Sequence, residues 1–204
     1  MTSEDYLGVL EVMSNGRSGF IRRPQASYTP SSEDVYVGQR VIQKHSLRTG
    51  DEICGEVGNP PGGGKSPPLK RVFTVNGVPA EELGHRPQFH RLSAIHPNQQ
   101  LALECGLERR GQPDYTNRII DLFCPLGKGQ RAMIVAPSKA GKTFVLQAIA
   151  EGILRNDPEA LVYILLVDER PEEVTEMGQH GYGEVFASSF DYPAERHVQV
   201  AEIT

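Results

Sequence analysis

The pattern of apolar and polar positions divides the chain into a first part of short strands and a later part in which strands alternate with helices. Residues 6–13 alternate apolar and polar positions and end at the turn Ser14-Asn15-Gly16, as expected for a half-buried strand. Closely spaced short strands with glycine-rich turns predict a small β-barrel. The further strands of this part are expected at 19–22, 34–37, 52–57 and 69–75.

The later part has the pattern of an α/β domain. Residues 132–135 and 161–167 are apolar runs with the length of buried strands, 161–167 being the central one. Alternation of buried strands with helices predicts a parallel sheet. A helix is expected over 143–154, with Val145, Leu146, Ile149 and Ile153 on its apolar face; further elements are a helix over 171–177, a strand over 185–188 and a helix from Pro193 to Thr204.

Three regions follow from these patterns. Residues 1–78 form the barrel domain, 79–118 a polar connector that wraps the surface, and 119–204 the α/β domain. Inside the first region, 58–68 (GNPPGGGKSPP) is low in complexity. Proline removes ladder donors and glycine adds backbone freedom, so this segment is predicted to be a flexible loop.

Charge and hydropathy narrow the class of protein only slightly. The net charge is −5, and mean hydropathy is −0.38. Residues 1–130 carry 15 Lys/Arg and 14 Asp/Glu (+1), whereas 131–204 carry 6 and 12 (−6). The net charge of a region says little about the charge of one groove on its surface, so these values neither favour nor exclude binding of nucleic acid. No apolar run approaches the roughly 20 residues of a membrane helix, and no secretory signal is visible, which predicts a cytoplasmic protein without a membrane partner.

The cysteines and histidines offer no metal-binding pattern. Cys54, Cys105 and Cys124 are odd in number and far apart, and no CxxC pair exists. They are expected to be reduced, buried thiols. The six histidines show no ligand spacing, so no metal site made of protein side chains is expected.

The strongest local motif is the segment from Ala136 to Thr143, APSKAGKT. It follows a predicted strand and begins a predicted helix, which is the context of a phosphate-binding loop. Backbone amides and the helix N-terminus there favour phosphate. Lys142 is expected to reach the β- and γ-phosphates of ATP, and Thr143 to hold Mg²⁺. Ala136 stands where the general pattern has glycine, and a plain strand–helix turn is the alternative interpretation.

A second motif, Asp168-Glu169-Arg170, ends the strand predicted at 161–167. Ligands of open parallel sheets bind at the carboxyl ends of strands, so a carboxylate there is placed to orient or deprotonate an attacking water. Alternatively, Asp168 and Glu169 only favour the N-terminus of the next helix, an effect of about 0.3–1 kcal/mol. Spacing alone does not choose between the two.

The first part of the chain carries an aromatic and basic set. Phe20 and Arg22 are two residues apart on one strand, so their side chains share a face. With Tyr36, and with Arg17 and Arg23 nearby, they could stack bases and contact the phosphates of single-stranded RNA. The alternative is that Phe20 and Tyr36 belong to the barrel core.

Several longer motifs resemble one family. APSKAGKT, LLVDERPEEVTEM, FDYPAERHVQVAE and LGKGQRAMIVA closely resemble Rho termination factors, and SLRTGD and DVYV resemble that family's cold-shock-like barrel, over about 7–204. The resemblance implies an α+β two-domain chain: a small OB or cold-shock-like β-barrel, then a truncated RecA-like P-loop α/β domain. It also implies a homohexameric helicase that hydrolyses ATP, moves along RNA and terminates transcription by RNA polymerase.

The resemblance assigns roles to individual residues. It implies that Glu169 is the catalytic carboxylate, with Arg170 beside it in the nucleotide site, and that Phe20, Arg22 and Tyr36 form the primary RNA-binding face. The family also carries alanine at the position of Ala136. The residues implied to bind ATP or its Mg²⁺ are Pro137, Ser138, Lys139, Ala140, Gly141, Lys142, Thr143 and Phe144.

The chain also departs from the family pattern. Arg17-Ser18 stands where an aromatic is expected, and the loop near 64–66 lacks an expected acidic/aromatic pair. By the resemblance, the family's N-terminal helical segment is expected to lie outside these residues, and its second Mg²⁺-associated aspartate, central-channel RNA loops and arginine finger are expected beyond Thr204. Two hypotheses therefore stay open: an RNA-dependent ATPase present as a truncated chain, and an RNA- and nucleotide-binding module without turnover. The segment DERPEEVTEM disfavours a third, an unrelated P-loop ATPase or kinase.

Overall fold

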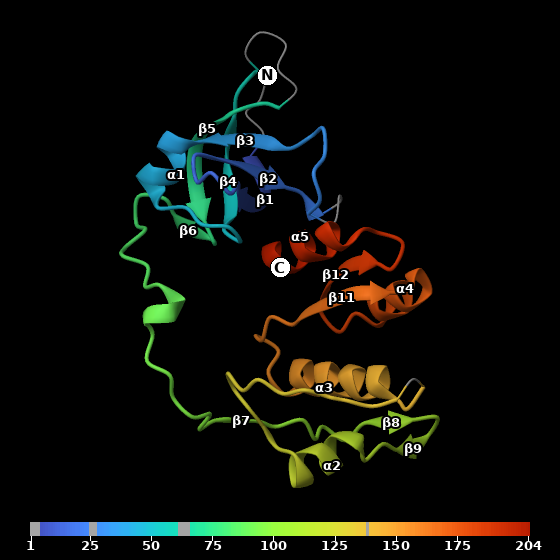
Figure 1. Ribbon diagram of the computed structural model, residues 1–204. Helices are drawn as coiled ribbons and strands as arrows, with labels where there is room; N and C mark the ends of the chain where they lie inside the picture. The colour runs from blue at the N-terminus through green and yellow to red at the C-terminus, as the bar shows by residue number, and fades with distance from the viewer. Residues whose placement is uncertain (1–4, 25–27, 61–65, 138) are drawn as a thin grey trace. The chain divides into compact units, whose positions relative to one another are not determined.

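Strands β1 to β6 form one antiparallel sheet in the order β3-β2-β1-β4-β5-β6 (Figure 1). The computed structural model describes residues 5–24, 28–60, 66–137 and 139–204. The elements of this part are β1 (Asp5–Val12), β2 (Ser18–Arg22), β3 (Val35–Gly38), α1 (Gln39–His45), β4 (Glu52–Val57), β5 (Leu69–Val75) and β6 (Val78–Pro79).

This sheet is strongly curled. In Figure 1, strands β2 and β3 cross strands β4 and β5 steeply. A parallel bridge joins Tyr36 to Pro68, where the Tyr36 amide donates to the Pro67 carbonyl at 2.8 Å, so β3 meets the start of β5. At Gly55, beside a bulge, a Cβ would lie 2.2 Å from the Arg71 carbonyl oxygen, and only glycine permits that approach.

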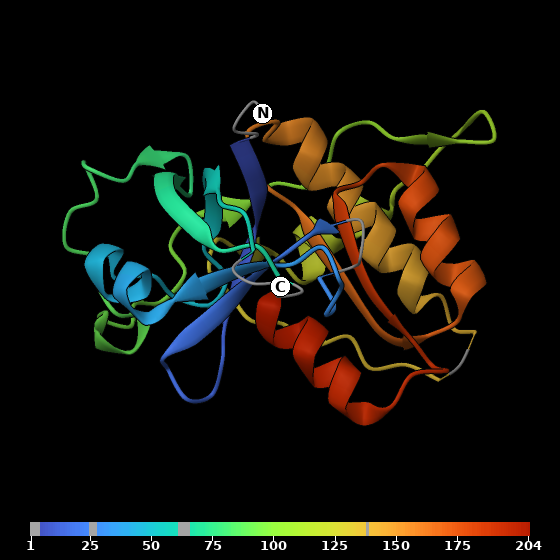
Figure 2. The same ribbon diagram turned by 90° about the horizontal axis from the view of Figure 1, so that it is seen from above.

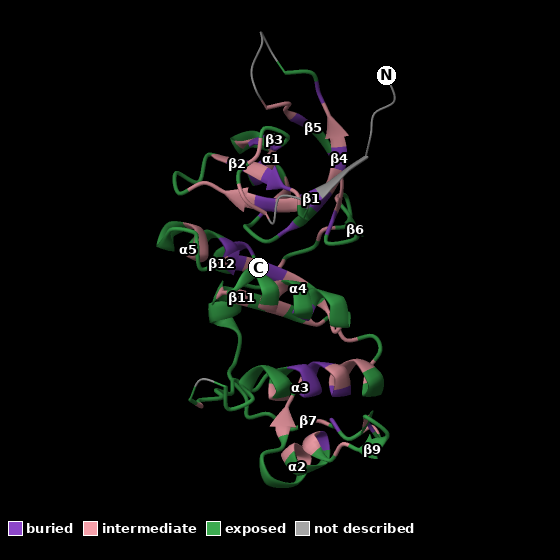
Figure 3. Cartoon of the chain, turned by 90° about the vertical axis from the view of Figure 1, so that its right-hand side faces the viewer, coloured by how far each residue is buried: buried purple, intermediate pink, exposed green. Residues whose placement is uncertain are grey.

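The apolar positions of these strands face inward. Leu10, Ile21, Val37, Ile53 and Val75 are fully buried, and Figure 3 shows buried residues along the strands. Burying one such side chain contributes roughly 1.5–3 kcal/mol. The strand predictions for this part are therefore confirmed to within about a residue or two, whereas α1 was not foreseen. The cluster is completed by Val35, Ile42, Leu47, Leu69 and Val72.

Asp51 ties the end of this part to the sheet. Its carboxylate accepts hydrogen bonds from Arg86 Nη1 (2.6 Å) and Nη2 (2.9 Å), the Arg48 amide (2.7 Å) and Asn76 Nδ2 (3.1 Å). The Arg48 guanidinium in turn donates to the carbonyls of Arg86 and Pro87. Burial alone would raise the pKa of Asp51, but these donors outweigh it and lower that pKa. We call these five residues the Asp51 clasp.

Further along the chain, helices α2 and α3 pack against each other and against residues 102–104. Gly152 makes this possible, because a Cβ there would lie 2.6 Å from both the Leu103 carbonyl oxygen and Asn117 Nδ2. Asn117 Nδ2 donates to the Ala148 carbonyl at 2.8 Å, and the Asp121 carboxylate accepts from the amides of Leu103 and Glu104. The elements here are η3 (Phe89–Arg91), β7 (Gln100–Leu101), β8 (Glu108–Arg109), β9 (Gln112–Pro113), α2 (Thr116–Phe123), β10 (Leu126–Gly127) and α3 (Lys142–Asn156).

The last part alternates strand and helix as predicted. Strands β11 and β12 form a two-stranded sheet and run in the same direction (Figure 2). The hydrogen bonds at the two ends show the same direction. The Glu184 amide donates to the Val162 carbonyl, and the Phe190 amide to the Glu169 carbonyl, so both segments advance together along the chain. The elements are β11 (Tyr163–Glu169), α4 (Pro171–His180), β12 (Glu184–Ser189) and α5 (Ala194–Ile203).

Two predicted buried strands differ in the structure. Residues 132–135 form no strand within the described part of the chain, and Met133 is 85% exposed. Among the described residues β11 pairs with β12 alone, so 161–167 is not a buried central strand, and Leu165 and Val167 stay partly exposed. A parallel strand is buried only when strands flank it and helices cover both faces, and the described part of the chain does not supply that cover to these segments.

The buried face of α3 also differs from the prediction. Leu146, expected on the apolar face, is 50% exposed, whereas Ala148 and Gly152 are buried (Figure 3). Small side chains let α2 and residues 102–104 approach closely, and that contact determines which face is covered. The predicted apolar face of α3 would be buried only if a sheet packed against it, and residues 132–135, which were expected to contribute a strand, form none in the described structure.

The chain groups into two compact units by its contacts. One comprises residues 1–88, 165–170 and 186–204, and the other comprises 89–164 and 171–185. The three cysteines, which all lie in the described part, form no disulfide with one another. None of them is buried and Cys124 is exposed, so the prediction of buried thiols is wrong. Among the described helices, none has the length and apolar character needed to cross a membrane.

Candidate functional site

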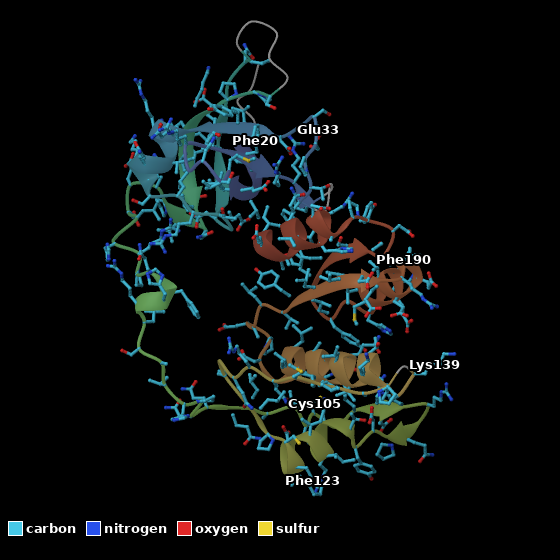
Figure 4. The ribbon with its side chains drawn as sticks, in the orientation of Figure 1. Phe20, Glu33, Cys105, Phe123, Lys139 and Phe190 are labelled. Carbon is cyan, nitrogen blue, oxygen red and sulfur yellow. The ribbon has the colours of Figure 1, made fainter. Side chains whose placement is uncertain are left out.

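Phe20, which is half-buried, and Tyr36, which is exposed, lie on neighbouring strands of the curled sheet. The two residues are direct partners in the β2–β3 ladder, and their rings meet edge to face with centroids 5.8 Å apart. Tyr36 is 38% exposed, and neither ring belongs to the buried cluster. The interpretation of both as core residues is therefore wrong. Figure 4 labels Phe20 on its strand.

Arg22 shares a face with Phe20, as its spacing predicts, and its guanidinium lies 5.1 Å from the ring centroid. The residue is nevertheless buried. Its Nε donates to Glu11 Oε2 at 2.6 Å, and Nη1 forms an ion pair with Asp34. Since two carboxylates neutralise this guanidinium, a contact with an RNA phosphate would require those pairs to rearrange.

Other basic residues of this part of the chain are more accessible. Arg17 is exposed, and Arg23 forms an ion pair with Glu33 at 2.9 Å near the surface. Arg71 on β5 is exposed and lies 5.7 Å from the Phe73 ring centroid, a cation–aromatic pair that sequence reasoning missed. The spacing of Arg71 and Phe73, two residues apart on one strand, is the sequence feature that predicts this pair. In the loop that departs from the family pattern, residues 61–65 lie outside the described part.

The phosphate loop begins α3, as predicted. Gly141 is the N-cap residue with φ 91°, and Lys139 is also left-handed with φ 62° (Figure 4). Lys142 and Thr143, in the first helical turn, are exposed. The first amides of a helix have no intrahelical acceptor, so those of this turn are available to an anion. Pro137 and Ala140 are exposed beside them, and Ser138 lies outside the described residues.

Asp168, Glu169 and Arg170 lie at the junction of β11 and α4. Asp168 is left-handed (φ 61°), a conformation that aspartate tolerates better than most residues, and it breaks the strand alternation before Glu169. Glu169 is half-buried, and its carbonyl accepts the Phe190 amide at 3.2 Å. Arg170 is exposed, directly before the helix that begins at Pro171. These residues belong to one compact unit and the phosphate loop to the other.

A short hairpin, β8–β9, adds a residue that sequence reasoning missed. The region was interpreted as connector, although Arg110-Gly111 is a turn signal. The hairpin places Arg109 4.6 Å from the ring centroid of Phe144, the residue that follows Thr143. Phe144 remains 40% exposed.

No cluster of metal-ligating side chains occurs among the described residues. A magnesium ion would instead enter with ATP, held by the Thr143 hydroxyl and by phosphate oxygens. The exposed hydroxyl at the start of α3 fits that role, because Mg²⁺ usually keeps several waters and takes few protein ligands.

Two family models match separate parts of the chain. The first, described as the RNA-binding domain of Rho termination factor, matches residues 6–81. The second, described as the nucleotide-binding domain of the ATP synthase alpha/beta family, matches residues 116–189. The first match contains the Phe20–Tyr36 pair, and the second contains the phosphate loop and Glu169.

Curated relatives align with almost the whole chain. The chain is 48% identical over 196 residues to a protein named Transcription termination factor Rho from Chromobacterium violaceum, covering 96% of this chain and 46% of that protein. Proteins of the same name from Aquifex aeolicus and Pseudomonas aeruginosa are 49% and 46% identical, with 44% and 46% of their lengths covered. The chain thus spans just under half the length of these relatives.

Proposed function

We propose that this chain, which belongs to the Rho transcription termination factor family, binds single-stranded RNA on its β2–β3 face and ATP with Mg²⁺ at residues 137–144. The observation that carries the proposal is the Phe20–Tyr36 pair. Two aromatic rings lie outside the core on adjacent strands, within the segment that matches an RNA-binding domain. Exposed rings of this kind stack bases at about 1–3 kcal/mol per base.

We propose that strands β3-β2-β1-β4-β5 form a small barrel of the OB or cold-shock-like type. Their order in the sheet and the bridge between β3 and the start of β5 support this assignment. Such barrels bind single strands on the strand face that carries the aromatic residues. We infer domain limits of 1–78 and 119–204, with 79–118 as the connector, and a RecA-like arrangement for the second domain.

In the nucleotide site, each residue of the chain would have a defined task. The exposed Lys142 ammonium and the amides of the first turn of α3 would bind the phosphates, with Lys139 as a further cation. Glu169 would orient the attacking water and accept its proton, and Arg170 would line the same site. Bound Mg²⁺ would neutralise charge on the phosphates.

The resemblance to the family implies a larger assembly. We propose that these residues work within a homohexamer that moves along RNA by ATP hydrolysis and releases transcripts from RNA polymerase. The alternative is an RNA- and nucleotide-binding module without turnover. The exposed position of residues 131–135, next to the phosphate loop, favours that alternative for the isolated polypeptide.

Calorimetric titration tests the nucleotide site. ATP with Mg²⁺ should bind the 204-residue chain, and Lys142→Ala should abolish the signal because it removes the phosphate-binding cation. Lys128→Ala is the matched control, since Lys128 pairs with Asp157 and lies outside the loop. Equal affinity of the unmodified chain and Lys142→Ala would contradict the site.

Fluorescence anisotropy with an unstructured RNA tests the other face. Phe20→Ala and Tyr36→Ala should each weaken binding by roughly 5- to 100-fold, as expected for a lost stacking surface. Affinity should fall steeply with salt concentration. Circular dichroism of both variants should remain that of the unmodified chain, and unchanged RNA affinity in both would exclude this face.

A further inference from the structure

We infer that Arg109, on the β8–β9 hairpin, is a positioning residue that holds Phe144 as a stacking platform for the base of the bound nucleotide. The inference rests on the proposed nucleotide site. It adds a residue from outside the phosphate loop and assigns it to the base rather than to the phosphates.

The hairpin fixes where Arg109 lies. Glu108 pairs with Pro113 and Arg109 with Gln112, and the two residues between them, Arg110 and Gly111, both have positive φ (53° and 72°). Two consecutive positive φ values are typical of a type I′ turn, which matches the twist of the flanking strands. The Asp114 amide donates to the Leu107 carbonyl at 2.8 Å and closes the hairpin.

Carboxylates on two elements then orient the guanidinium. Arg109 Nε donates to Asp114 Oδ2 at 2.5 Å, and Nη2 lies 3.5 Å from Glu151 Oε2 on α3. Hydrogen bonds from other residues fix the positions of both carboxylates. Asp114 accepts from the Thr116 amide and hydroxyl, and Glu151 accepts from Arg155 Nη2 (2.9 Å).

In this position the guanidinium lies against the Phe144 ring, with 4.6 Å to the centroid. Cation–aromatic contacts stabilise by roughly 0.5–2 kcal/mol, depending on burial. Because Phe144 is also fixed to the first turn of α3, its ring has little freedom to turn. It still exposes 40% of its surface, which leaves area for a second planar ring beside the phosphate loop.

Charge indicates that Arg109 serves the base. Its single positive charge faces two carboxylates, so the group has no net positive charge to offer a polyphosphate. Lys139 and Lys142, by contrast, are exposed and make no ion pair among the described side chains.

The test compares ATP with tripolyphosphate, which has the phosphates but no base, by calorimetry on the 204-residue chain with Mg²⁺. Arg109→Ala should weaken ATP binding by about three- to tenfold, as expected for losing a cation–aromatic contact that orders the stacking ring. Its tripolyphosphate affinity should stay within about twofold of the unmodified chain. Phe144→Ala should show the same selectivity, and Arg109→Ala should add nothing in the Phe144→Ala background.

Arg155→Ala is the matched control, because Arg155 also pairs with Glu151 but has no aromatic ring beneath it in the described structure. It should bind both ligands normally. If Arg109→Ala lowers both affinities equally, or neither, the inference is overturned while the nucleotide site stands. If the unmodified chain binds neither ligand, the proposed site fails and the inference with it. Arg109→Lys keeps the positive charge, so its ATP affinity should lie between those of the unmodified chain and Arg109→Ala. This variant tests the inference if Arg109→Ala does not fold.

Discussion

The sheet of β1–β6 and the segments around the phosphate loop make different use of apolar residues. In the first, the apolar positions of the strands are buried, and Ile53 has no exposed surface. In the second, Met133 and Val135 are more than 80% exposed, and β11 has a neighbouring strand on one edge only within the described ranges. Both regions have strand-like sequences, so local pattern alone does not explain the difference.

The difference lies in where each strand finds its partners. Strands β1, β2 and β3 are joined by short connections, and β4 and β5 return to the same sheet within residues 5–79, so the core closes locally. A parallel strand needs crossover connections and cover on both faces. The relatives that match this chain are more than twice as long. The second region therefore depends on contacts that the first does not need.

Turnover gives the largest expected contrast between the regions. The 204-residue chain should bind RNA but show no RNA-stimulated ATP hydrolysis. An arginine finger supplies about 10³–10⁵ of the rate in related NTPases, and without that contribution we expect no turnover. Phosphate release with and without RNA measures this, with Glu169→Gln as the control for contaminating ATPase. RNA-dependent turnover that disappears in Glu169→Gln would show that the second region is catalytically sufficient.

Ion pairs give the next contrast. Arg22→Ala would leave the buried Asp34 without its cation, so it should destabilise the first region by about 3–5 kcal/mol. Lys128→Ala breaks the exposed pair with Asp157 and should cost about 0–1 kcal/mol. Urea unfolding followed by circular dichroism measures both. A stable Arg22→Ala chain whose RNA affinity depends less on salt would instead make Arg22 a phosphate contact.

Core truncation tests burial directly. Ile53→Ala should cost about 2–5 kcal/mol, because it leaves a cavity in a closed core. Val135→Ala removes methyl groups that are already exposed, so its cost should stay within about 0.5 kcal/mol. The same unfolding assay applies. A large loss from Val135→Ala would mean that this segment is packed in solution, and the contrast between the regions would disappear.

The Asp51 clasp predicts a dependence on pH. Its lowered pKa stabilises the fold above the unfolded value of about 3.9, and that contribution is lost as pH falls through the folded pKa. Asp51→Asn should therefore cost about 1.5–3 kcal/mol at pH 7 and progressively less below pH 4. Unfolding curves between pH 3 and 7 measure the difference. A constant gap between the two proteins across that range would show that the charge contributes nothing.

The sequence predicted the first region well because its signals are local. Alternation of apolar and polar positions marks β1, and short apolar runs separated by turns mark the other strands, without information from elsewhere in the chain. The Phe20–Tyr36 face was also predictable, since a strand period of two puts Phe20 and Arg22 on one side. Burial of Arg22 was not, because Asp34 and Glu11 become its partners only after three strands pair.

In the second region, the phosphate loop and α3 followed from GKT and helical spacing, whereas the buried face of α3 did not. That face is chosen by Gly152 and Asn117, which are distant in sequence and carry no apolar signal. The same applies to Arg109. A short hairpin is visible in the turn Arg110-Gly111, but its contact with Phe144 is a tertiary event.

The Asp51 clasp also limits the free length of the chain segment that leaves the sheet, which we call the tether. Because Arg86 and Pro87 are held against the sheet, the tether comprises residues 88–99 and ends before β7, which begins at Gln100. Twelve residues reach at most about 43 Å when fully extended, and roughly 17–21 Å on average if flexible. Releasing the clasp would lengthen that tether by several residues without altering either binding surface.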